Sequence, residues 1–545
     1  MGCHCAGILR RAALLAILAG SCAAQIQEIS GERIRAHVKF VASDLLEGRA
    51  PGTRGEKLAV EYLAAQFALV GAKPAGDNST YFQKVPLVGV DPQPASELSA
   101  RGRGRTVRLR WLEEFVGASQ RQKPLDQFEA EAVFVGHGIT APEYQWDDFK
   151  GADVRGKTLV LFTNEPTSTD ANFFGGRALT YYGRWTYKYE EALRRGALGV
   201  IIIHTTPTAG YGWNVVRTSW GREQPSVKLA AGEAALAFAG WVTSEAGEKL
   251  LAPSRHTVAE LLKASESRDF RPIPLGIRVR GRLAAKVREL DTSNVVARVA
   301  GSDPELTSEA VIFSAHWDHL GVGAPVNGDP IYNGAVDNAT GCGILVEIAR
   351  AWAALEQKPR RSALFLAVTA EEGGLRGSEY YALHPAVPAG KTALALNYDA
   401  FPPVGRVADV VLSGAERTTA LPVIEGVARR MGLEIKPDPH PEQGSYYRSD
   451  HFSFAKVGIP AFSVKTGDRI AGKPADFGEQ FFREFNSKHY HQPSDEYHAD
   501  WDFAGLEQMA RFGLLIGLEA ANLERLPTWK PGDEFLPARE KSGVK

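Results

Sequence analysis

Cysteine is scarce in this chain, and nearly all of it stands close to the start. Of four cysteines in 545 residues, Cys3, Cys5 and Cys22 precede residue 25, and Cys342 is the only one beyond it. If the first 24 residues are removed, no internal disulfide can form, so stability must come from packing. Cys342 stands between two glycines at an expected helix start, where a small buried thiol is more typical than a nucleophile.

An excess of charge of one sign is also lacking. The 63 basic and 64 acidic residues leave a formal net charge of -1, and no basic stripe interrupts this balance. The electrostatic footprint of a nucleic-acid-binding protein is therefore absent. The composition, 44% hydrophobic and 23% charged, excludes global disorder, and the length favours two or three domains. We find no internal repeats.

No apolar run reaches the length of a membrane-spanning helix. Near the start, Arg10 and Arg11 precede a short apolar run over 12–19, and small residues over 20–24 follow. This order of positive, apolar and small residues predicts a signal peptide over 1–24, and hence export to the periplasm or the cell exterior. Cys22 also admits a lipid anchor, although Ala19 stands where a lipobox usually has leucine.

Two regions of different pattern follow the signal. Residues 25–126 are expected to begin the catalytic domain, with a helix marked by Leu58, Leu63 and Phe67 and hairpin edges or a linker over 92–110. Residues 127–285 then carry short β-rich runs at 132–135, 158–162 and 199–204, with a helix over 187–195. No acidic or histidine cluster with ligand spacing occurs there, so we interpret this region as an inserted, non-catalytic β-rich domain.

Residues 286–525 have the strand–helix alternation of an α/β domain, and 526–545 form a tail. Nearly continuous apolar runs at 311–315, 363–369, 392–398 and 459–464 predict strands covered on both faces. A helix with Leu345, Ile348 and Trp352 on one stripe lies between the first two, and a long helix over 502–523 closes the domain. The pattern predicts a mostly parallel sheet with helices on both faces.

Acidic or histidine side chains stand directly after three successive expected strands. The first strand leads to His316 and Asp318, the second to Glu371 and Glu372, and the third to Asp399. Because open α/β sheets bind ligands outside the carboxyl ends of their strands, we expect these side chains to gather at one edge.

Two residues from loops can complete this group. Asp337 lies in the glycine-bounded turn 333–341, and His491 lies on a late loop. Imidazole and carboxylate without thiolate is a ligand set that zinc prefers. Together with His316, Glu372 and Asp399, these residues suffice for two ions if one carboxylate bridges them.

Two close dications would share a water, which becomes hydroxide near neutral pH and attacks a carbonyl. A carboxylate that is not a ligand must then take the proton and pass it to the leaving amine. Glu371 suits this role of general base, because successive residues at a strand end point in different directions and Glu372 can face the metal.

Each residue taken alone also fits a plainer interpretation. An Asp after a strand is more often a helix cap or turn former than a ligand, and Glu371 with Glu372 fits a solvated loop. Such residues at the ends of three successive strands nevertheless favour a metal centre. We expect His319, His489 and His498 to be loop histidines or neighbours of the ligands.

Five sequence blocks resemble the di-zinc bacterial leucyl aminopeptidase family, which also includes glutamate carboxypeptidase II and the transferrin receptor. In family order they are Ser-Ala-His316-Trp-Asp318, Gly-Ala-Val-Asp337-Asn, Thr-Ala-Glu371-Glu372-Gly-Gly, Asn-Tyr-Asp399 and Tyr-His491-Gln-Pro-Ser-Asp. The similarity spans about 294–523. It implies the phosphorylase/hydrolase-like zinc exopeptidase fold, a peptide substrate and two Zn²⁺ per chain, although cobalt or manganese fits the same ligands.

The resemblance also implies a role for each matched residue. His316 and Asp399 would hold one zinc, and Glu372 and His491 the other. Asp337 would bridge the two ions.

Further matched residues would act on the ligands or the substrate. Asp318 would orient His316 through its second ring nitrogen, and Glu371 would act first as base and then as acid. Tyr446 matches a tyrosine whose hydroxyl helps to hold the tetrahedral oxyanion, with Tyr447 as its alternative.

The inserted region resembles a protease-associated domain over 133–139, 156–162 and 190–204. Such a domain would restrict access to the cleft, and a purely structural role is an equal expectation.

Three functions fit this sequence. The first is an aminopeptidase that releases N-terminal residues. The second is another zinc reaction in the same frame, either carboxypeptidase action or glutaminyl cyclisation; the cyclases use one zinc, so the retention of His316 and Asp399 argues against them. The third is a binding or receptor protein on an inactive scaffold, which would lack ligands, whereas here none is missing.

Overall fold

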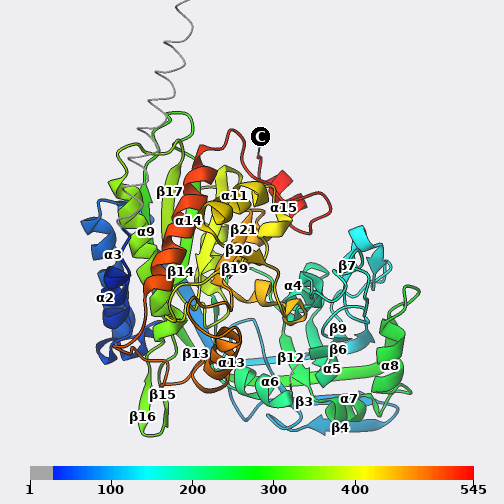
Figure 1. Ribbon diagram of the computed structural model, residues 1–545. Coiled ribbons are helices and arrows are strands. Elements are labelled where there is room, and N and C mark those ends of the chain that lie inside the picture. Colours follow the sequence, from blue (N-terminus) through cyan, green and yellow to red (C-terminus); the bar gives the residue numbers. More distant parts are fainter. Residues whose placement is uncertain (1–28, 210–211, 545) are drawn as a thin grey trace, which may run out of the picture. The chain divides into compact units, whose positions relative to one another are not determined.

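The computed structural model describes residues 29–209 and 212–544. The expected signal peptide over 1–24, with Cys22, lies outside this range. Contacts divide the chain into two compact units. The first comprises Met1–Val85, Asp291–Asp438 and Arg448–Lys545, and the second comprises Pro86–Leu290 and Pro439–Tyr447. Figure 1 shows the elements of both units along the chain.

The first unit is built on a mixed sheet whose central strands are parallel. These are, in spatial order, β17 (Ser362–Val368), β14 (Ala310–His316), β18 (Thr392–Tyr398) and β21 (Ala461–Thr466). Antiparallel strands flank them: β13 (Ile273–Val299) and then β1 (Lys73–Pro74) beside β17, and β19 (Asp409–Val411) with β20 (Glu434–Lys436) beside β21. The four strands predicted from apolar runs are thus confirmed.

Helices cover both faces of this sheet. On one face, α9 (Thr340–Ala354) and α14 (Ala504–Asn522) pack against each other and on β14 and β18. On the other, α12 (His451–Lys456) contacts β18, β21 and α10 (Arg376–Leu383). The alternation of side chains along β14 explains this arrangement, because Val311, Phe313 and Ala315 join the core that includes α9 and α14.

Two glycines allow α14 to lie close to the sheet. A Cβ atom on Gly517 would stand 2.4 Å from the Phe313 ring, and one on Gly513 would stand 1.5 Å from the Tyr398 hydroxyl oxygen. Neither position therefore accommodates a side chain without a shift of the helix or of these aromatic rings.

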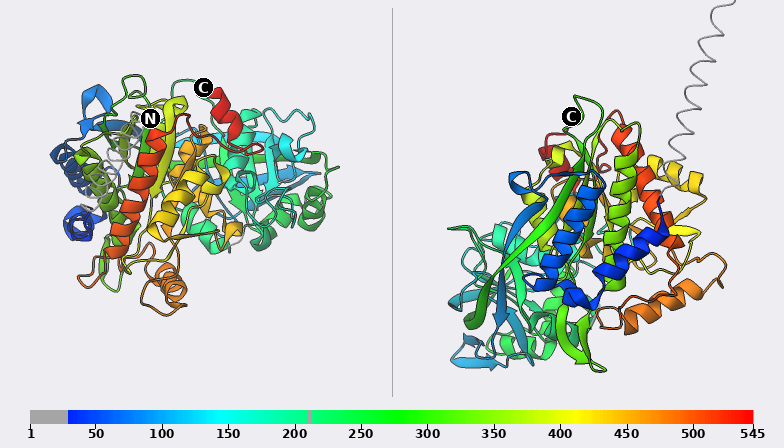
Figure 2. Two further views of the ribbon diagram at one scale, coloured as in Figure 1. Left: turned by 45° about the horizontal axis from the view of Figure 1, so that its top comes forward. Right: turned by 90° about the vertical axis from the view of Figure 1, so that its left-hand side faces the viewer.

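The remaining elements of the first unit lie around this core. Helices α2 (Gly31–Val41) and α3 (Arg54–Leu69) pack beside α9 (Figure 2). The others are the 3-10 turn η1 (Asp44–Arg49), the hairpin of β15 (Gly321–Val326) and β16 (Asp329–Tyr332), and helices α11 (Leu421–Met431), α13 (Phe477–Lys488) and α15 (Leu536–Lys541).

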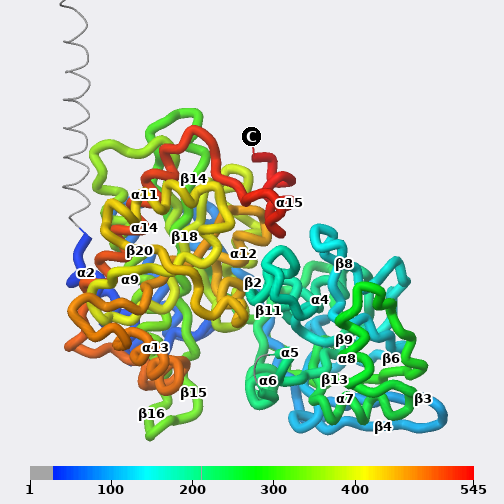
Figure 3. The backbone as a smooth tube through the Cα atoms, turned by 45° about the vertical axis from the view of Figure 1, so that its right-hand side comes forward, coloured from blue at the N-terminus to red at the C-terminus, as the bar shows by residue number. Residues whose placement is uncertain are grey.

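The second unit has its own mixed sheet. Its parallel strands are β6 (Leu125–Phe134), β9 (Thr158–Phe162), β10 (Gly199–Ile203) and β12 (Phe238–Val242), in that order. β5 (Phe115–Ala118) pairs with β12, and the first half of β13 pairs with β6 and with the hairpin strand β3 (Glu97–Gly102), next to β4 (Arg105–Leu109). Figure 3 traces the backbone of this unit.

Alternate residues of β9 and β10 enter two separate cores, one on each face of the second sheet. Val160 and Ile201 join one core, and Leu159 and Val200 join the other. Helices α4 (Trp185–Arg194), α6 (Trp213–Trp220), α7 (Ser244–Leu251) and α8 (Val258–Ser265) complete the unit, along with β2 (Phe82–Pro92) and β11 (Gln224–Val227).

The second unit begins earlier than the insert that we expected over 127–285. Its first segment runs from Pro86 to Leu290, and it starts early because β3, β4 and β5 pair with strands of this unit. The polar stretch 92–110 is the β3–β4 hairpin, one of the two alternatives given for it. Within residues 29–209 and 212–544, no helix combines the length and the apolar character needed to cross a membrane.

Candidate metal centre

The carboxyl ends of three parallel strands place the predicted residues together. His316 is the last residue of β14, Glu371 and Glu372 follow the end of β17, and Asp399 follows β18 directly. Asp337 comes from η5 (Ala335–Ala339), the irregular turn that precedes α9.

The first donor group forms around the ring of His316. Its Nε2 lies 3.2 Å from Asp337 Oδ1 and 3.3 Å from Asp399 Oδ1. Both His316 and Asp337 are buried. The three side chains thus present one donor atom each to a common point.

The second donor group includes the other oxygen of Asp337. His491 Nε2 lies 3.3 Å from Asp337 Oδ2 and 3.0 Å from Glu372 Oε2. His491 is in the loop after α13 and has a φ of 59°. Because Asp337 gives one carboxylate oxygen to each group, it stands between them as a bridging ligand would.

The donor set fits divalent metal ions. Among the described residues, His491 Nε2 and Glu372 Oε1 are buried atoms without a well-oriented hydrogen bond, although carboxylate oxygens lie near His491 Nε2 and His319 Nδ1 lies 2.7 Å from Glu372 Oε1. Carboxylate and imidazole donors also match zinc chemistry. In addition, burial and the charges of Glu372 and Asp450 raise the pKa of Asp318 to about 7, so the region carries more acidic groups than its histidines compensate, which favours added cations.

Glu371 lies beside the donor groups rather than within either of them. One of its carboxylate oxygens comes within 4.8 Å of donors from His316 and Glu372. Burial raises the pKa of Glu371 well above its usual value, and Asp399 and Glu372 add to this shift. Such a carboxyl group accepts a proton readily.

Asp318 acts on a different part of the site than expected. Its carboxylate accepts hydrogen bonds from the backbone N–H of Glu371 (3.1 Å) and of Glu372 (3.4 Å). The Nδ1 of His316 instead meets the backbone carbonyl of Asp318 at 3.2 Å, with the carboxylate oxygen at 3.9 Å. Asp318 therefore fixes the strand end that carries Glu371 and Glu372, and its main chain orients His316.

Three residues that are not glycine have positive φ angles at the site. These are Ala370 (51°), Ala400 (58°) and His491 (59°). Ala370 precedes Glu371, and Ala400 follows Asp399. Since side chains disfavour this backbone region, the surrounding structure must impose it, as is common at functional sites.

We expected His319 to be a loop histidine or a neighbour of the ligands, and the structure places it beside Glu372. Its ring is buried, and its Nδ1 lies 2.7 Å from Glu372 Oε1. A donor atom of His319 also groups with Asp337 and Glu372. The His-x-x-His spacing of His316 and His319 was the available signal.

A buried polar chain behind Asp399 was missed. Asp399 Oδ2 accepts a 2.5 Å hydrogen bond from Ser449 Oγ, which accepts from the Asn397 amide at 2.8 Å. Ser314 Oγ donates to Asn397 Oδ1 at 2.8 Å. Ser314 and Asn397 face away from the core of α9 and α14, and their alternation along the strands was the signal for this chain.

Two further residues join the centre from the loops. Tyr490 stacks on His491, with ring centroids 3.9 Å apart. Desolvation and the charges of Asp337 and Glu372 raise its pKa well above the usual value. Asp450 is fully buried, and burial raises its pKa to about 7.

The other candidate residues have different surroundings. Tyr446 belongs to the segment Pro439–Tyr447 of the second unit, so its role as an oxyanion donor stays a prediction. In the same segment Tyr447 packs against Tyr181, with ring centroids 6.1 Å apart. His489 Nδ1 lies 2.9 Å from Ser494 Oγ in an exposed loop, and the ring of His498 lies 5.5 Å from that of Trp501, so both are loop histidines.

The buried side chain of Cys342 contacts the backbone of the ligand residue His316. Its Sγ donates to the His316 carbonyl oxygen at 3.3 Å. Burial raises the pKa of the thiol to about 11, so the group is a neutral, packed side chain.

The fold and the site together define the class of metal-dependent α/β hydrolases. Residues 294–513 match Peptidase family M28, and the chain therefore contains a domain of this family. A probable leucine aminopeptidase 2 from Aspergillus oryzae is 34% identical over 116 residues, 21% of either protein. The match thus spans about a fifth of the length of this curated relative.

Two solved structures are similar over most of the chain. The aminopeptidase from Aneurinibacillus sp. strain AM-1 is 21% identical, with a TM-score of 0.49 over 93% of this chain and 98% of that one. A zinc aminopeptidase from Bacillus subtilis is 16% identical, with a TM-score of 0.42 over 93% of this chain and 97% of that one.

Proposed function

We propose that this protein is a zinc metallopeptidase with two ions per chain, and that it releases N-terminal residues from peptides. The observation that carries the proposal is the position of Asp337. Its two carboxylate oxygens lie 3.2 Å from His316 Nε2 and 3.3 Å from His491 Nε2. One carboxylate between two separate groups of donors suits a pair of dications.

Each donor group would hold one ion. His316 and Asp399 would hold the first, Glu372 and His491 the second, and Asp337 both. When bound, two such ions supply Lewis acidity toward a carbonyl oxygen and lower the pKa of a water molecule. This pair of groups supports peptide hydrolysis rather than a reaction at one ion.

Glu371 would move the proton in this reaction. Its backbone N–H is fixed by Asp318 at 3.1 Å, and the residue is half-buried beside His316 and Glu372, one member of each donor group. A carboxylate there can take a proton from the attacking water and deliver it to the amine of the departing peptide.

An aminopeptidase is favoured over a carboxypeptidase by the charge of the site. Asp318, Glu371 and Asp450 are acidic groups beyond the ligand set. Asp318 and Asp450 are fully buried, so they would favour a substrate ammonium group over a carboxylate through their charge at a distance rather than by contact. The names of the similar proteins, a probable leucine aminopeptidase and two aminopeptidases, agree with this choice. Tyr446 remains our candidate donor to the oxyanion, with Tyr447 as its alternative.

We also propose that the protein is exported to the periplasm or the cell exterior and that its second unit is a protease-associated domain. Export is supported by the order of residues over 1–24, and Cys22 is the candidate for a lipid anchor there. The second unit lacks a group of acidic and histidine donors among its described residues, which supports a non-catalytic role.

Hydrolysis of paired substrates tests this function. The chain without residues 1–24 would be assayed on aminoacyl chromogenic substrates, on the same compounds with blocked amines, and on C-terminal reporter peptides. We expect cleavage only where the amine is free, with loss on chelation and recovery on added Zn²⁺. Cleavage of only blocked or C-terminal substrates would contradict the aminopeptidase assignment, and no cleavage of any of them would indicate an inactive scaffold.

A further inference from the structure

Arg49 is fully buried in the first unit, at the end of η1. Four hydrogen bonds link its guanidinium to backbone carbonyl oxygens: Nε donates to Trp317 at 2.6 Å, Nη2 to Gly334 at 2.6 Å, and Nη1 to Val41 at 3.2 Å and to Asn333. A buried cation is costly to desolvate, so an arginine at this position is hard to explain by packing alone.

Three of the four carbonyl groups that Arg49 binds belong to two loops of the metal centre, and the fourth, of Val41, ends α2. Trp317 directly follows His316, and Gly334 stands three residues before Asp337. Both loops have irregular backbone, whose polar groups need partners when buried. One side chain from the N-terminal segment thus satisfies backbone groups next to two of the proposed ligands.

Asp495 binds the backbone N–H groups of the same turn. Its carboxylate accepts from the N–H of Val336 at 2.9 Å and of Asp337 at 3.1 Å, and its carbonyl oxygen accepts from the N–H of Ala335 at 3.0 Å. Asp495 is buried. Five consecutive residues, 333–337, are therefore bound through their carbonyl groups by Arg49 or through their N–H groups by Asp495.

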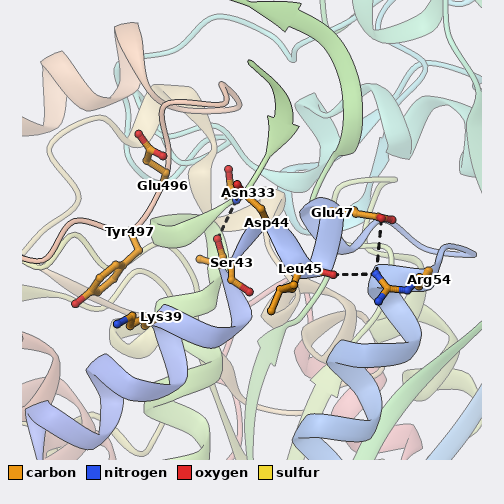
Figure 4. Close-up of a pocket in the computed structure, with 10 residues that line it drawn as sticks. Lys39, Ser43, Asp44, Leu45, Glu47, Arg54, Asn333, Glu496 and Tyr497 are labelled. Atoms are coloured by element: carbon orange, nitrogen blue, oxygen red, sulfur yellow. Dashed lines mark hydrogen bonds and ion pairs between the residues drawn. The ribbon is translucent and has the colours of Figure 1, made fainter. Parts of the chain in front are cut away.

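The side chain of Asn333 adds a third attachment. Its amide donates to the Ala42 carbonyl oxygen at 2.9 Å and to Asp44 Oδ1 at 2.8 Å. Figure 4 shows Asn333 facing Asp44 at a surface pocket whose lining also includes Glu496 and Tyr497. The elements that carry Arg49 and Asp495 thus both reach this pocket, on the outer side of the turn 333–337.

We propose that Arg49 and Asp495 are positioning residues, which act as a clamp on residues 333–337 and fix the carboxylate of Asp337 between the two donor groups. This proposal rests on the proposed function in one respect, namely that Asp337 is the shared ligand. Neither residue touches the substrate. They hold the backbone of residues 333–337 in one conformation, so that each carboxylate oxygen of Asp337 stays directed at one of the two proposed ions.

The test uses Arg49→Lys and Asp495→Asn in the full chain without its signal. Affinity for Zn²⁺ would be measured by competition with a chelator. We expect affinity about 10- to 100-fold weaker in each variant, as for other residues that orient metal ligands. In the double variant the two effects should combine less than additively in free energy, because both residues hold one turn.

Matched controls come from buried residues that hydrogen-bond segments other than the turn 333–337. Arg361 is a buried arginine just before β17, and it binds Glu309 and the carbonyl oxygen of Leu523. Asp409 is a buried carboxylate that accepts from the N–H of Arg469. Arg361→Lys and Asp409→Asn should change zinc affinity less than twofold. Equal affinity in the clamp variants and the wild type, or equal losses in the controls, would overturn the proposal.

Hydrogen exchange of the metal-free protein separates the clamp from the proposed function. The amides of residues 335–337 should exchange faster in Arg49→Lys and Asp495→Asn than in the two controls. If the wild type takes up no zinc, the proposed function fails, and this measurement alone decides the clamp. Unchanged exchange in the clamp variants would refute it.

Discussion

Each unit contains three neighbouring parallel strands that end in polar residues, but the ends have different chemistry. In the first unit, β14, β17 and β18 lead to His316, Glu371, Glu372 and Asp399. In the second, β9, β10 and β12 lead to Thr163, His204 and Thr243. The topology is alike, since both sets are parallel and buried on both faces.

The strand ends of the second unit make local structural contacts. Thr163 Oγ1 donates to the Gly183 carbonyl oxygen at 3.2 Å, and Thr243 Oγ1 caps α7 by accepting from the N–H of Ala246 at 3.0 Å. The ring of His204 packs against Trp213, with centroids 5.7 Å apart. These contacts are those of turns and caps.

The difference shows that a parallel sheet provides the place for a site, whereas the residue types at the strand ends provide its chemistry. Three acidic or histidine ends converge on shared points in the first unit. In the second, two hydroxyl groups bond backbone groups, and one imidazole packs against a tryptophan ring. Substitutions at the strand ends should therefore affect metal binding and activity in the first unit and only stability in the second.

The largest effect is expected at Glu371. Glu371→Gln should reduce kcat by roughly 100- to 10,000-fold, because the amide cannot accept the proton of the attacking water. Metal content should stay at the wild-type value, since Glu371 is not a ligand. Steady-state kinetics with metal analysis of the same sample would check this, and an active variant would remove Glu371 from its role.

Zinc affinity should depend strongly on pH. Without metal, the pKa of His491 is raised to about 10: burial lowers it, but Glu372 and Asp337 outweigh that effect. The pKa of His316 is also raised well above its usual value, since burial is outweighed by Glu371 and Asp337. These raised pKa values favour the protonated form of both rings in the metal-free protein, and zinc must displace these protons.

This competition between zinc and protons sets the direction in which zinc affinity changes with pH. As pH rises from 7 toward 9, apparent affinity should increase by up to about tenfold per pH unit for each proton displaced. Titration calorimetry in buffers of different ionisation enthalpy would count the protons released. An affinity independent of pH over this range would contradict the protonated state of both histidines.

The smallest effect is expected at the strand ends of the second unit. Thr243→Ala removes the cap of α7 and should lower the free energy of unfolding by about 1 kcal/mol. Metal content and kcat should remain within twofold of the wild type. Urea unfolding alongside metal analysis would measure both, and loss of zinc from this variant would show that the two sets of strand ends are not independent.

Much of the first unit was predictable from sequence. The apolar runs at 311–315, 363–369 and 392–398 are strands because residues buried on both faces leave no polar alternation, and the polar residue after each run indicates its carboxyl end. Asp337 could be proposed as a ligand from its glycine-bounded turn, but only the family resemblance implied that it is the bridging ligand.

Other features depend on contacts that sequence spacing does not reveal. Asp318 binds the backbone N–H of Glu371, 53 residues away, whereas the family resemblance implied that its side chain orients the second ring nitrogen of His316. Arg49 and Asp495 come from distant segments, and their partners are backbone atoms, which leave no trace in residue type. The early start of the second unit at Pro86 depends in the same way on strand pairing.

Metal analysis of Asp337→Ala tests the central claim most directly. Wild type, Asp337→Ala and, as a control, Glu371→Gln would be loaded with Zn²⁺, desalted and measured by mass spectrometry for zinc per chain. Two ions are expected in the wild type and in Glu371→Gln, and close to none in Asp337→Ala, because the shared carboxylate is lost from both groups. Two ions retained by Asp337→Ala would contradict a site in which this carboxylate joins the two metals.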